Sequence, residues 1–222
     1  MGKSLYIAEK PSVAQEFAKA LKINGQRKDG YLESEDSVVT WCVGHLVTMS
    51  YPEKYDIKYK AWRLHDLPFL PEEYKYEIIA NVQKQFDIIK EQMNRDDVTT
   101  IYVCTDSGRE GEYIYRLVDM MVDAKSKEKK RVWIDSQTED EIKKGVKNAK
   151  PLEAYDNLAD SAFLRAKEDY LMGINFSRLL TLCYGRTLAK KLEKDHIVIA
   201  VGRVMTCVLG MIVNRRSEEH TS

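Results

Sequence analysis

The segment that most constrains the fold is residues 98–112, where a short apolar run is followed at once by an acidic, glycine-containing turn. Residues 98–104 (VTTIYVC) are rich in β-branched and aromatic side chains, which favours a buried strand. Residues 105–112 (TDSGREGE) are acidic, and helical spacing of apolar residues resumes at 113. The segment therefore predicts a strand, an acidic turn and a helix. Its charged groups would lie at the carboxyl end of a strand, where open α/β sheets place their ligands.

The carboxylates Asp106, Glu110 and Glu112 of this turn predict a cation site. Close like charges raise one another's pKa unless a cation neutralises them. Hard oxygen ligands with access to water suit Mg²⁺ better than zinc. The alternative is a solvated acidic turn that caps a helix, because carboxylates are favourable at a helix N-terminus.

A second acidic element follows the first apolar run of the chain. Residues 4–8 (SLYIA) predict the first strand, Glu9 and Lys10 come next, and Pro11 begins a segment with helical spacing to residue 21. If this strand is a parallel neighbour of residues 98–104, Glu9 and Lys10 share a sheet edge with Asp106. A metal and Lys10 would then meet phosphate and Glu9 would handle a proton, which is typical of phosphodiester chemistry. A surface ion pair of little energetic value is the alternative.

Strands and helices alternate through residues 1–150, which we predict to be one domain. Strands are expected at 4–8, around 30–47, at 98–104 and at 131–135. Helices are expected at 12–21, 78–94, 110–123 and 138–148, with an irregular excursion at 50–76 and a solvated basic loop at 125–131. This alternation predicts the α/β class, with a mostly parallel sheet covered by helices on both faces.

Beyond the boundary at residues 150 and 151, residues 151–215 predict a mostly α domain, with helices at 153–173, 176–184 and 202–213. This region is too short to close its own core, so we expect a truncated domain. Its last apolar pattern breaks abruptly into the polar residues 216–222 (RSEEHTS), which we interpret as a non-native tail.

Taken together, these motifs resemble the type IA DNA topoisomerases, and most closely their bacterial topoisomerase III branch. Residues 9–12 (EKPS), 44–46 (GHL) and 105–112 (TDSGREGE) are similar to the family's Toprim domain, which has a Rossmann-like fold. Residues 165–178 (RAKEDYLMGINFSR) and 201–206 (VGRVMT) resemble the start of its next, DNA-binding domain. The motifs occur in the family's order and cover nearly the whole chain.

The resemblance implies an enzyme that cuts one DNA strand, passes another through the gap and reseals it, with Mg²⁺ and without ATP. It implies that Glu9 and Lys10 are catalytic, with Lys10 at the scissile phosphate. The metal ligands implied by the motif are Glu9, Asp106 and Glu110, to which we add Glu112. The DNA-binding residues are expected to be Lys10, Arg165, Asp169, Arg178 and Arg203.

Three positions depart from the family's pattern. Gly108 stands in place of a second aspartate, which should weaken metal binding unless Glu112 or water substitutes. Met205 and Cys207 replace a usual glutamine and proline, and a thioether cannot make an amide's hydrogen bonds. The family's nucleophilic tyrosine belongs to a motif beyond those matched, so we expect the chain alone to be inactive.

Two other functional classes stay open: another Toprim phosphodiester enzyme, such as a primase or nuclease, and a non-catalytic DNA-binding module. The net charge does not distinguish between these classes, because 35 basic residues balance 35 acidic ones. Between residues 165 and 215, however, basic residues outnumber acidic ones nine to four, which favours phosphate binding. Trp62, Phe69 and nearby tyrosines either stack on bases or fix a long loop to its domain.

The remaining features concern location and partners. The four cysteines lack Cys-x-x-Cys spacing, and two lie in strand-like runs that suit buried, reduced thiols. No stretch reaches transmembrane length and no signal peptide begins the chain. We therefore expect a cytoplasmic, nucleoid-associated bacterial protein, monomeric, bound to DNA that is single-stranded or has single-stranded regions, with no membrane contact and with protein partners unspecified.

Overall fold

The computed structural model describes residues 2–124 and 127–219. Residues 125 and 126 of the predicted basic loop and residues 220–222 of the predicted tail lie outside the described residues. The chain divides into two compact units. Unit 1 comprises residues 1–48 and 76–163, and unit 2 comprises residues 49–75 and 164–222. The domain boundary that we predict after residue 150 is a division along the chain and stays a prediction.

Unit 1 is built on a seven-stranded sheet with the order β2-β3-β4-β1-β7-β8-β9. At its centre β1 (Lys3–Ala8) pairs in parallel with β4 (Ser37–Trp41) and β7 (Val98–Cys104), and β7 pairs in parallel with β8 (Glu128–Arg131). The outer strands β2 (Gln26–Lys28), β3 (Tyr31–Glu33) and β9 (Lys150–Pro151) join by antiparallel pairing. The predicted α/β class is therefore confirmed, with a sheet that is parallel at its centre and mixed at its edges.

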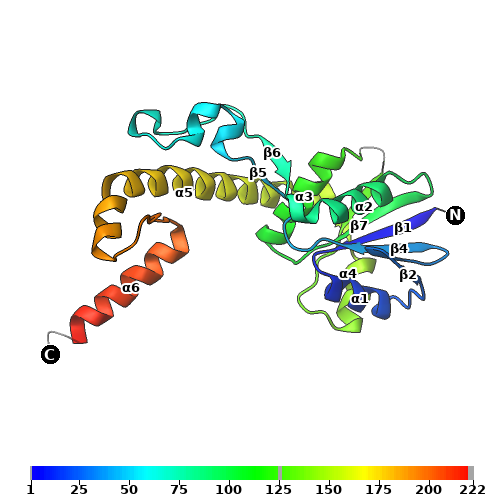
Figure 1. Ribbon diagram of the computed structural model, residues 1–222. Coiled ribbons are helices and arrows are strands. Elements are labelled where there is room, and N and C mark those ends of the chain that lie inside the picture. Colours follow the sequence, from blue (N-terminus) through cyan, green and yellow to red (C-terminus); the bar gives the residue numbers. More distant parts are fainter. Residues whose placement is uncertain (1, 125–126, 220–222) are drawn as a thin grey trace. The chain divides into compact units, whose positions relative to one another are not determined.

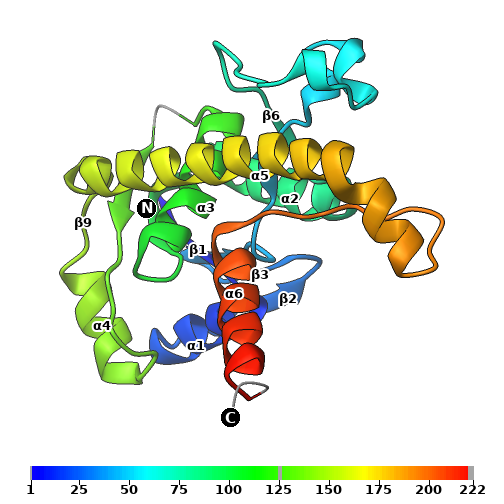
Figure 2. The ribbon, with the colours of Figure 1, turned by 90° about the vertical axis from the view of Figure 1, so that its left-hand side faces the viewer.

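Helices cover both faces of this sheet, as predicted (Figures 1 and 2). One face carries α1 (Pro11–Ala20) and α4 (Glu139–Lys147), and the other carries α2 (Gln83–Asn94) and α3 (Arg109–Val122). Tyr6 and Ala8 of β1 pack into a cluster with Phe17 and Ile142. Leu5 and Ile7 alternate with them and are fully buried. A central strand covered on both faces explains the uninterrupted apolar run at the start of the chain.

Shorter elements complete the described chain. They are β5 (Val47–Met49), which pairs with β6 (Tyr76–Ile78), and the 3₁₀ helices η1 (Pro52–Lys54), η2 (Ile57–Lys60), η3 (Leu64–Asp66), η4 (Ala80–Val82) and η5 (Leu152–Tyr155). Two long helices, α5 (Asp156–Lys191) and α6 (Arg203–Glu219), dominate the second half. Among the described residues, no helix is long and apolar enough to cross a membrane.

Two local predictions are wrong. The strand expected at 131–135 is β8, which covers residues 128–131 and so lies inside the stretch expected to be a solvated loop. This charged strand forms because its backbone pairs in parallel with β7. Its charged side chains are also partnered, Lys129 with Asp119 at 2.7 Å and Lys130 with Glu128 at 3.1 Å. The helices expected at 153–173 and 176–184 are the single helix α5. One glycine inside a helix costs only about 1 kcal/mol, so Gly173 does not interrupt it.

In unit 2 the loop of residues 50–75 is fixed to α5 by polar and aromatic contacts. Asn175 accepts from the Phe69 backbone N–H at 2.6 Å and donates to the Phe69 carbonyl at 2.9 Å. The Tyr170 hydroxyl donates to the Ser50 carbonyl at 2.6 Å, and the Phe69 ring is buried. Phe69 therefore fixes the loop to the helix, whereas Trp62 stays 37% exposed.

An ion network ties together the amino ends of the central strands in unit 1. The Glu33 carboxylate accepts from Arg95 at 2.6 Å, from Lys28 at 2.6 Å and from Lys3 at 2.8 Å. These hydrogen bonds, that from Arg95 most of all, hold the pKa of Glu33 well below its usual value of 4.5. Because the folded-state pKa is depressed, the network stabilises the fold above pH 4.5 and loses this contribution as the pH falls below that value.

We accordingly predict that Glu33→Gln lowers the free energy of unfolding by about 1.5–3 kcal/mol at pH 7. The difference from the parent protein should shrink steadily below pH 4.5, because Glu33 of the unfolded parent takes up a proton there while Glu33 of the folded parent stays ionised, which favours unfolding of the parent. Urea unfolding at pH 7, 5 and 3 measures both effects. Glu35→Gln, at an exposed neighbouring position, is the control and should change little. A Glu33→Gln deficit that is the same at every pH would contradict the assignment.

Candidate active site

Glu9 and Lys10 leave the carboxyl end of β1, where Pro11 begins α1. Glu9 is buried, with 6% of its surface exposed, and its Oε2 accepts from the backbone N–H of Asp106 at 3.2 Å. The Lys10 ammonium lies 3.8 Å from the other Glu9 oxygen and is more than half exposed. The predicted adjacency of Glu9, Lys10 and Asp106 thus exists in the structure, because β1 and β7 are parallel neighbours.

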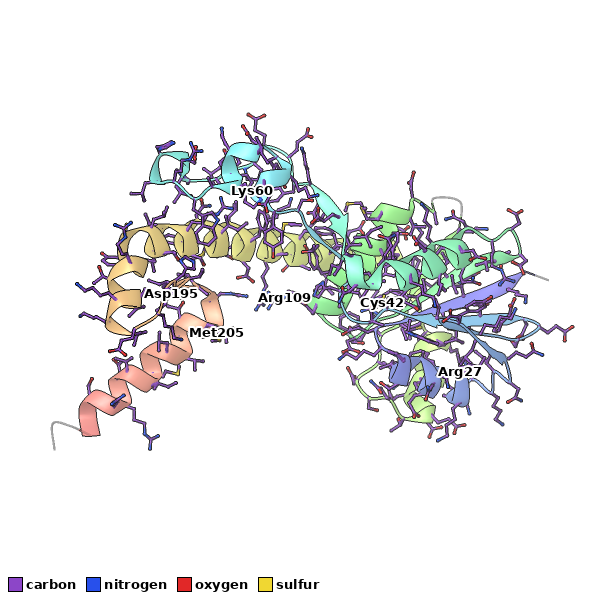
Figure 3. All side chains as sticks on the ribbon, in the orientation of Figure 1. Arg27, Cys42, Lys60, Arg109, Asp195 and Met205 are labelled. Atoms are coloured by element: carbon purple, nitrogen blue, oxygen red, sulfur yellow. The ribbon has the colours of Figure 1, made fainter. Side chains whose placement is uncertain are left out.

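The acidic turn between β7 and α3 is held in one conformation by close backbone packing. Thr105 is buried, and its hydroxyl donates to the Gly111 carbonyl at 2.8 Å. Gly111 is so close to the turn that a Cβ there would lie 2.1 Å from the Asp106 carbonyl oxygen, so only glycine fits. Arg109, labelled in Figure 3, begins α3, which follows Gly108 directly.

Beneath this turn lies Arg131, a fully buried side chain from β8. Its guanidinium donates to the carbonyls of Val103 at 3.2 Å, Thr105 at 2.8 Å, Asp106 at 2.7 Å and Val132 at 2.9 Å. It also donates to Glu112 at 2.8 Å. Sequence reasoning missed this residue, because it stands at the end of a basic run that resembles a solvated loop. The one available signal was Glu112 itself, since a carboxylate among the apolar positions of a helix needs a buried cation.

Glu112 differs in its surroundings from the other predicted metal ligands. It is completely buried, and its two oxygens are 2.8 Å from Arg131 and 2.9 Å from Arg116. Arg116 in turn pairs with Asp156 at 2.8 Å. Two arginines already neutralise the Glu112 carboxylate, so we leave it out of the ligand set proposed below.

Glu110 lies in the first turn of α3 with its side chain 73% exposed. Its Oε1 is 2.6 Å from Nε2 of His45, which follows Gly44 in the predicted GHL motif. The His45 ring also meets the edge of Tyr113 at a centroid distance of 6.0 Å. The structure thus adds His45 to the residues around the acidic turn.

The chemical type of the side chains at this edge fits Mg²⁺. Glu9, Asp106 and Glu110 offer carboxylate oxygens, which are the ligands that this ion prefers. The three carboxylates do not form a preassembled metal site in this structure. Within residues 2–124 and 127–219, no three carboxylate, imidazole or thiol groups lie close enough together to hold a metal ion. The buried thiols do not contribute, because burial raises the pKa of Cys42 to about 12 and raises that of Cys104 as well.

Unit 2 holds the other predicted residues. Asp169 and Arg203 pair at 2.8 Å, both partly exposed, which joins α5 to the start of α6. Arg178 is buried, with its guanidinium 5.3 Å from the Trp62 ring centroid. Burial lowers the pKa of Arg178 from its usual value, because desolvation disfavours the charged guanidinium. Arg165 is half-buried on α5, and Met205 is exposed on α6.

Comparison with known proteins adds a decisive observation. Residues 4–136 match the model of the Toprim domain family, and residues 153–221 match that of the DNA topoisomerase family. The chain belongs to the type IA DNA topoisomerases. It is 45% identical over 218 residues to DNA topoisomerase 3 of Bacillus thuringiensis (strain Al Hakam) and of Bacillus anthracis, and 39% identical to that of Bacillus subtilis (strain 168).

Each alignment covers 98% of this topoisomerase chain but only 28% of the relative. The Toprim match contains β1, β7 and the acidic turn, so the site described above is the Toprim edge of the topoisomerase. The second match begins just before α5 and includes Asp169, Arg178 and Arg203. The resemblance drawn from the motifs is therefore confirmed at the level of the family.

Proposed function

We propose that these residues form the Toprim and adjoining DNA-binding part of a topoisomerase that cleaves, passes and reseals single DNA strands with Mg²⁺ and without ATP. The observation that carries this proposal is the meeting of Glu9, Lys10 and the Asp106 turn at one edge of the sheet, linked by the 3.2 Å contact between Glu9 and the Asp106 backbone. The second match, to the DNA topoisomerase family, favours this function over a primase, a nuclease or a non-catalytic module.

In this proposal Glu9, Asp106 and Glu110 hold the metal, and Glu110 leaves His45 to do so. Bound there, Mg²⁺ supplies positive charge to phosphate oxygens. Lys10, exposed beside Glu9, contacts the scissile phosphate as a second positive charge. Glu9, buried and within hydrogen-bonding distance of the turn, carries the proton that is exchanged with the leaving sugar oxygen.

The tyrosines nearest the acidic turn in sequence are poor candidates for the nucleophile. Tyr113 and Tyr115 are both buried in α3, and burial raises the pKa of each phenol. We therefore propose that another part of the protein supplies the attacking tyrosine and that these 222 residues alone do not cleave DNA. Arg165, Asp169, Arg178 and Arg203 support binding of single-stranded DNA, and we keep the cytoplasmic, nucleoid-associated and monomeric state as predictions.

The test is relaxation of negatively supercoiled plasmid by the whole protein that contains these residues, with Mg²⁺ and without ATP. We expect Mg²⁺-dependent relaxation and a covalent protein–DNA adduct after denaturation. Neither product at any Mg²⁺ concentration would contradict the proposal. In the same assay, DNA hydrolysis without resealing would instead support a nuclease.

Gly108 gives a separate prediction about the metal. Its φ of 172° is extended backbone that any residue adopts, and a Cβ there would meet nothing within 4 Å. Gly108→Asp should therefore fold normally and lower the Mg²⁺ concentration needed for thermal stabilisation several-fold, because a further carboxylate strengthens a hard-cation site. Gly108→Asn matches the shape without the charge and should behave like the parent. Equal Mg²⁺ responses in all three proteins would contradict a metal at this turn.

A further inference from the structure

Unit 2 contains a groove of about 500 Å³ that the proposed chemistry does not use. It lies between α5 and the loop of residues 50–75, which run side by side (Figure 1). Both walls belong to one compact unit. We call it the apolar groove, because its walls are largely hydrocarbon: Leu64, Leu67 and Leu70 from the loop, and Met172, Phe176 and Leu179 from α5.

The apolar groove is open to solvent. Leu64, Leu70, Met172, Phe176 and Leu179 keep between 37% and 65% of their surface exposed. On α5 the three groove residues follow one another at intervals of four and three residues, so they form one stripe of the helix. A contiguous exposed apolar surface of this kind marks a site of interaction with another molecule.

The groove is already formed, because Asn175 ties its two walls together. The Asn175 amide accepts from the Phe69 backbone N–H and donates to the carbonyls of Phe69 and Leu171. Both N–H groups of this amide are in use, so Asn175, the polar lining residue, is satisfied without a ligand. The backbone N–H and carbonyl of Phe69 are occupied as well. A helix is therefore a better occupant than an added strand, which would need free backbone groups at an edge.

The two walls run in opposite directions, which fixes what lies at each end of the groove. Trp62 contacts Arg178, at a centroid distance of 5.3 Å, whereas Tyr74 contacts Tyr170 at 6.1 Å. The start of the loop wall therefore lies beside the later turns of α5, and its end lies beside the earlier turns.

The exposed side chains at the start of the loop wall are basic. Arg63 and His65 flank Leu64, and the side chains of both are more than half exposed. The one carboxylate beside them, Asp66, is largely buried and lies 4.0 Å from Arg63 and 3.8 Å from His65. This basic end of the groove attracts carboxylates.

The exposed side chains at the opposite end are acidic. Glu72 and Glu73 follow Leu70 in the loop, and Glu168 lies one turn before Met172 on α5. Within residues 2–124 and 127–219, none of these three carboxylates has an ion pair. This acidic end of the groove attracts cationic side chains.

We propose that the apolar groove binds an amphipathic α-helix of a partner protein. The α5 wall from Leu171 to Leu179 is about 12 Å long at about 1.5 Å per residue, so the groove accommodates about two turns of helix. Apolar side chains at positions i, i+3 or i+4, and i+7 of the partner fill it. Carboxylates near one end of the partner helix meet the basic end of the groove, and cations near its other end meet the acidic end.

A partner helix fits these features better than a second copy of this chain. A two-fold dimer sets one groove against another, and two concave surfaces cannot fill each other. The inference does not depend on the proposed function, because the groove residues include none of those assigned to the metal, the phosphate or DNA.

The test is fluorescence anisotropy of three fluorescein-labelled helical peptides titrated with the whole protein that contains these residues. All three peptides carry leucines at i, i+3, i+4 and i+7. The mixed peptide has glutamates at one end and lysines at the other, the acidic peptide has glutamates at both ends, and the basic peptide has lysines at both ends. We expect the mixed peptide to bind about three- to tenfold more tightly than either of the others, because several exposed ion pairs add together.

Three variants locate the binding. Phe176→Glu should weaken binding of the mixed peptide at least about tenfold, because a charge replaces an apolar anchor in the middle of the groove. Glu72→Lys/Glu73→Lys should shift the preference to the acidic peptide, because the acidic end then becomes basic. The matched control is Leu164→Glu, which changes an exposed leucine of the same helix outside the groove and should bind like the parent.

No binding of the mixed peptide at protein concentrations up to about 100 μM would overturn the proposal, as would parent-like binding by folded Phe176→Glu. Binding by the 222-residue chain but not by the whole protein would show that another part of the same protein fills the groove. Dimerisation of the parent in light scattering that Phe176→Glu abolishes would show a second copy there. Either result would overturn the partner helix. If circular dichroism shows that Phe176→Glu does not fold, Met172→Glu decides.

Discussion

Arg131→Met is expected to lower the free energy of unfolding by about 3–5 kcal/mol, the usual loss when one partner of a buried ion pair is removed. The substitution leaves Glu112 with one partner, the partly buried Arg116, and removes the donor to the carbonyls of Thr105 and Asp106. Because the Asp106 carbonyl is one of these acceptors, the acidic turn should also lose its fixed conformation. Denaturant titration of the chain measures the stability, and Mg²⁺-induced thermal stabilisation reports on the turn.

Two variants isolate the cause of this loss. Lys143→Met removes an exposed partner of Glu139 and should cost no more than about 0.5 kcal/mol. Arg131→Met combined with Glu112→Gln should recover part of the stability, because the uncompensated buried carboxylate is then absent. A loss below 1 kcal/mol for Arg131→Met, or no recovery in the double variant, would show that the buried network is not what holds the turn.

Glu9→Gln is expected to reduce plasmid relaxation by the whole protein about 10²-fold or more, the usual contribution of a positioned acid or base. An amide oxygen can still accept from the Asp106 N–H, so the local fold should survive. What the variant loses is the negative charge and the exchangeable proton at a buried position. Relaxation rates at saturating Mg²⁺ measure the effect, and circular dichroism checks the fold.

Glu16→Gln serves as the companion variant, because Glu16 is exposed on α1 and lies outside the acidic edge. It should relax plasmid at the parent's rate. Normal relaxation by Glu9→Gln would exclude a catalytic role for this carboxylate.

The local pattern of the chain was sufficient to predict the strand, turn and helix at residues 98–122 and the strand and helix at residues 4–21. Spacing of apolar residues reports the backbone conformation directly, because the periods of strands and helices differ. The rule that parallel strands align their carboxyl ends then placed Glu9 and Lys10 beside Asp106. The same reasoning was wrong for β8, whose residues are mostly charged and carry no apolar signal.

Which charged groups become partners was decided only by the tertiary structure. Arg131 reaches Glu112 across 19 residues because β8 lies beside β7 and under α3, and His45 reaches Glu110 across 65 residues. Arg178 reaches Trp62 because the loop of residues 50–75 packs on α5. The sequence by itself determined most of the elements of unit 1, the family and the acidic edge. Strand order and packing alone determined that Glu112 is a buried structural carboxylate and that the loop of residues 50–75 forms an apolar groove with α5, because pairing depends on distances that no local pattern encodes.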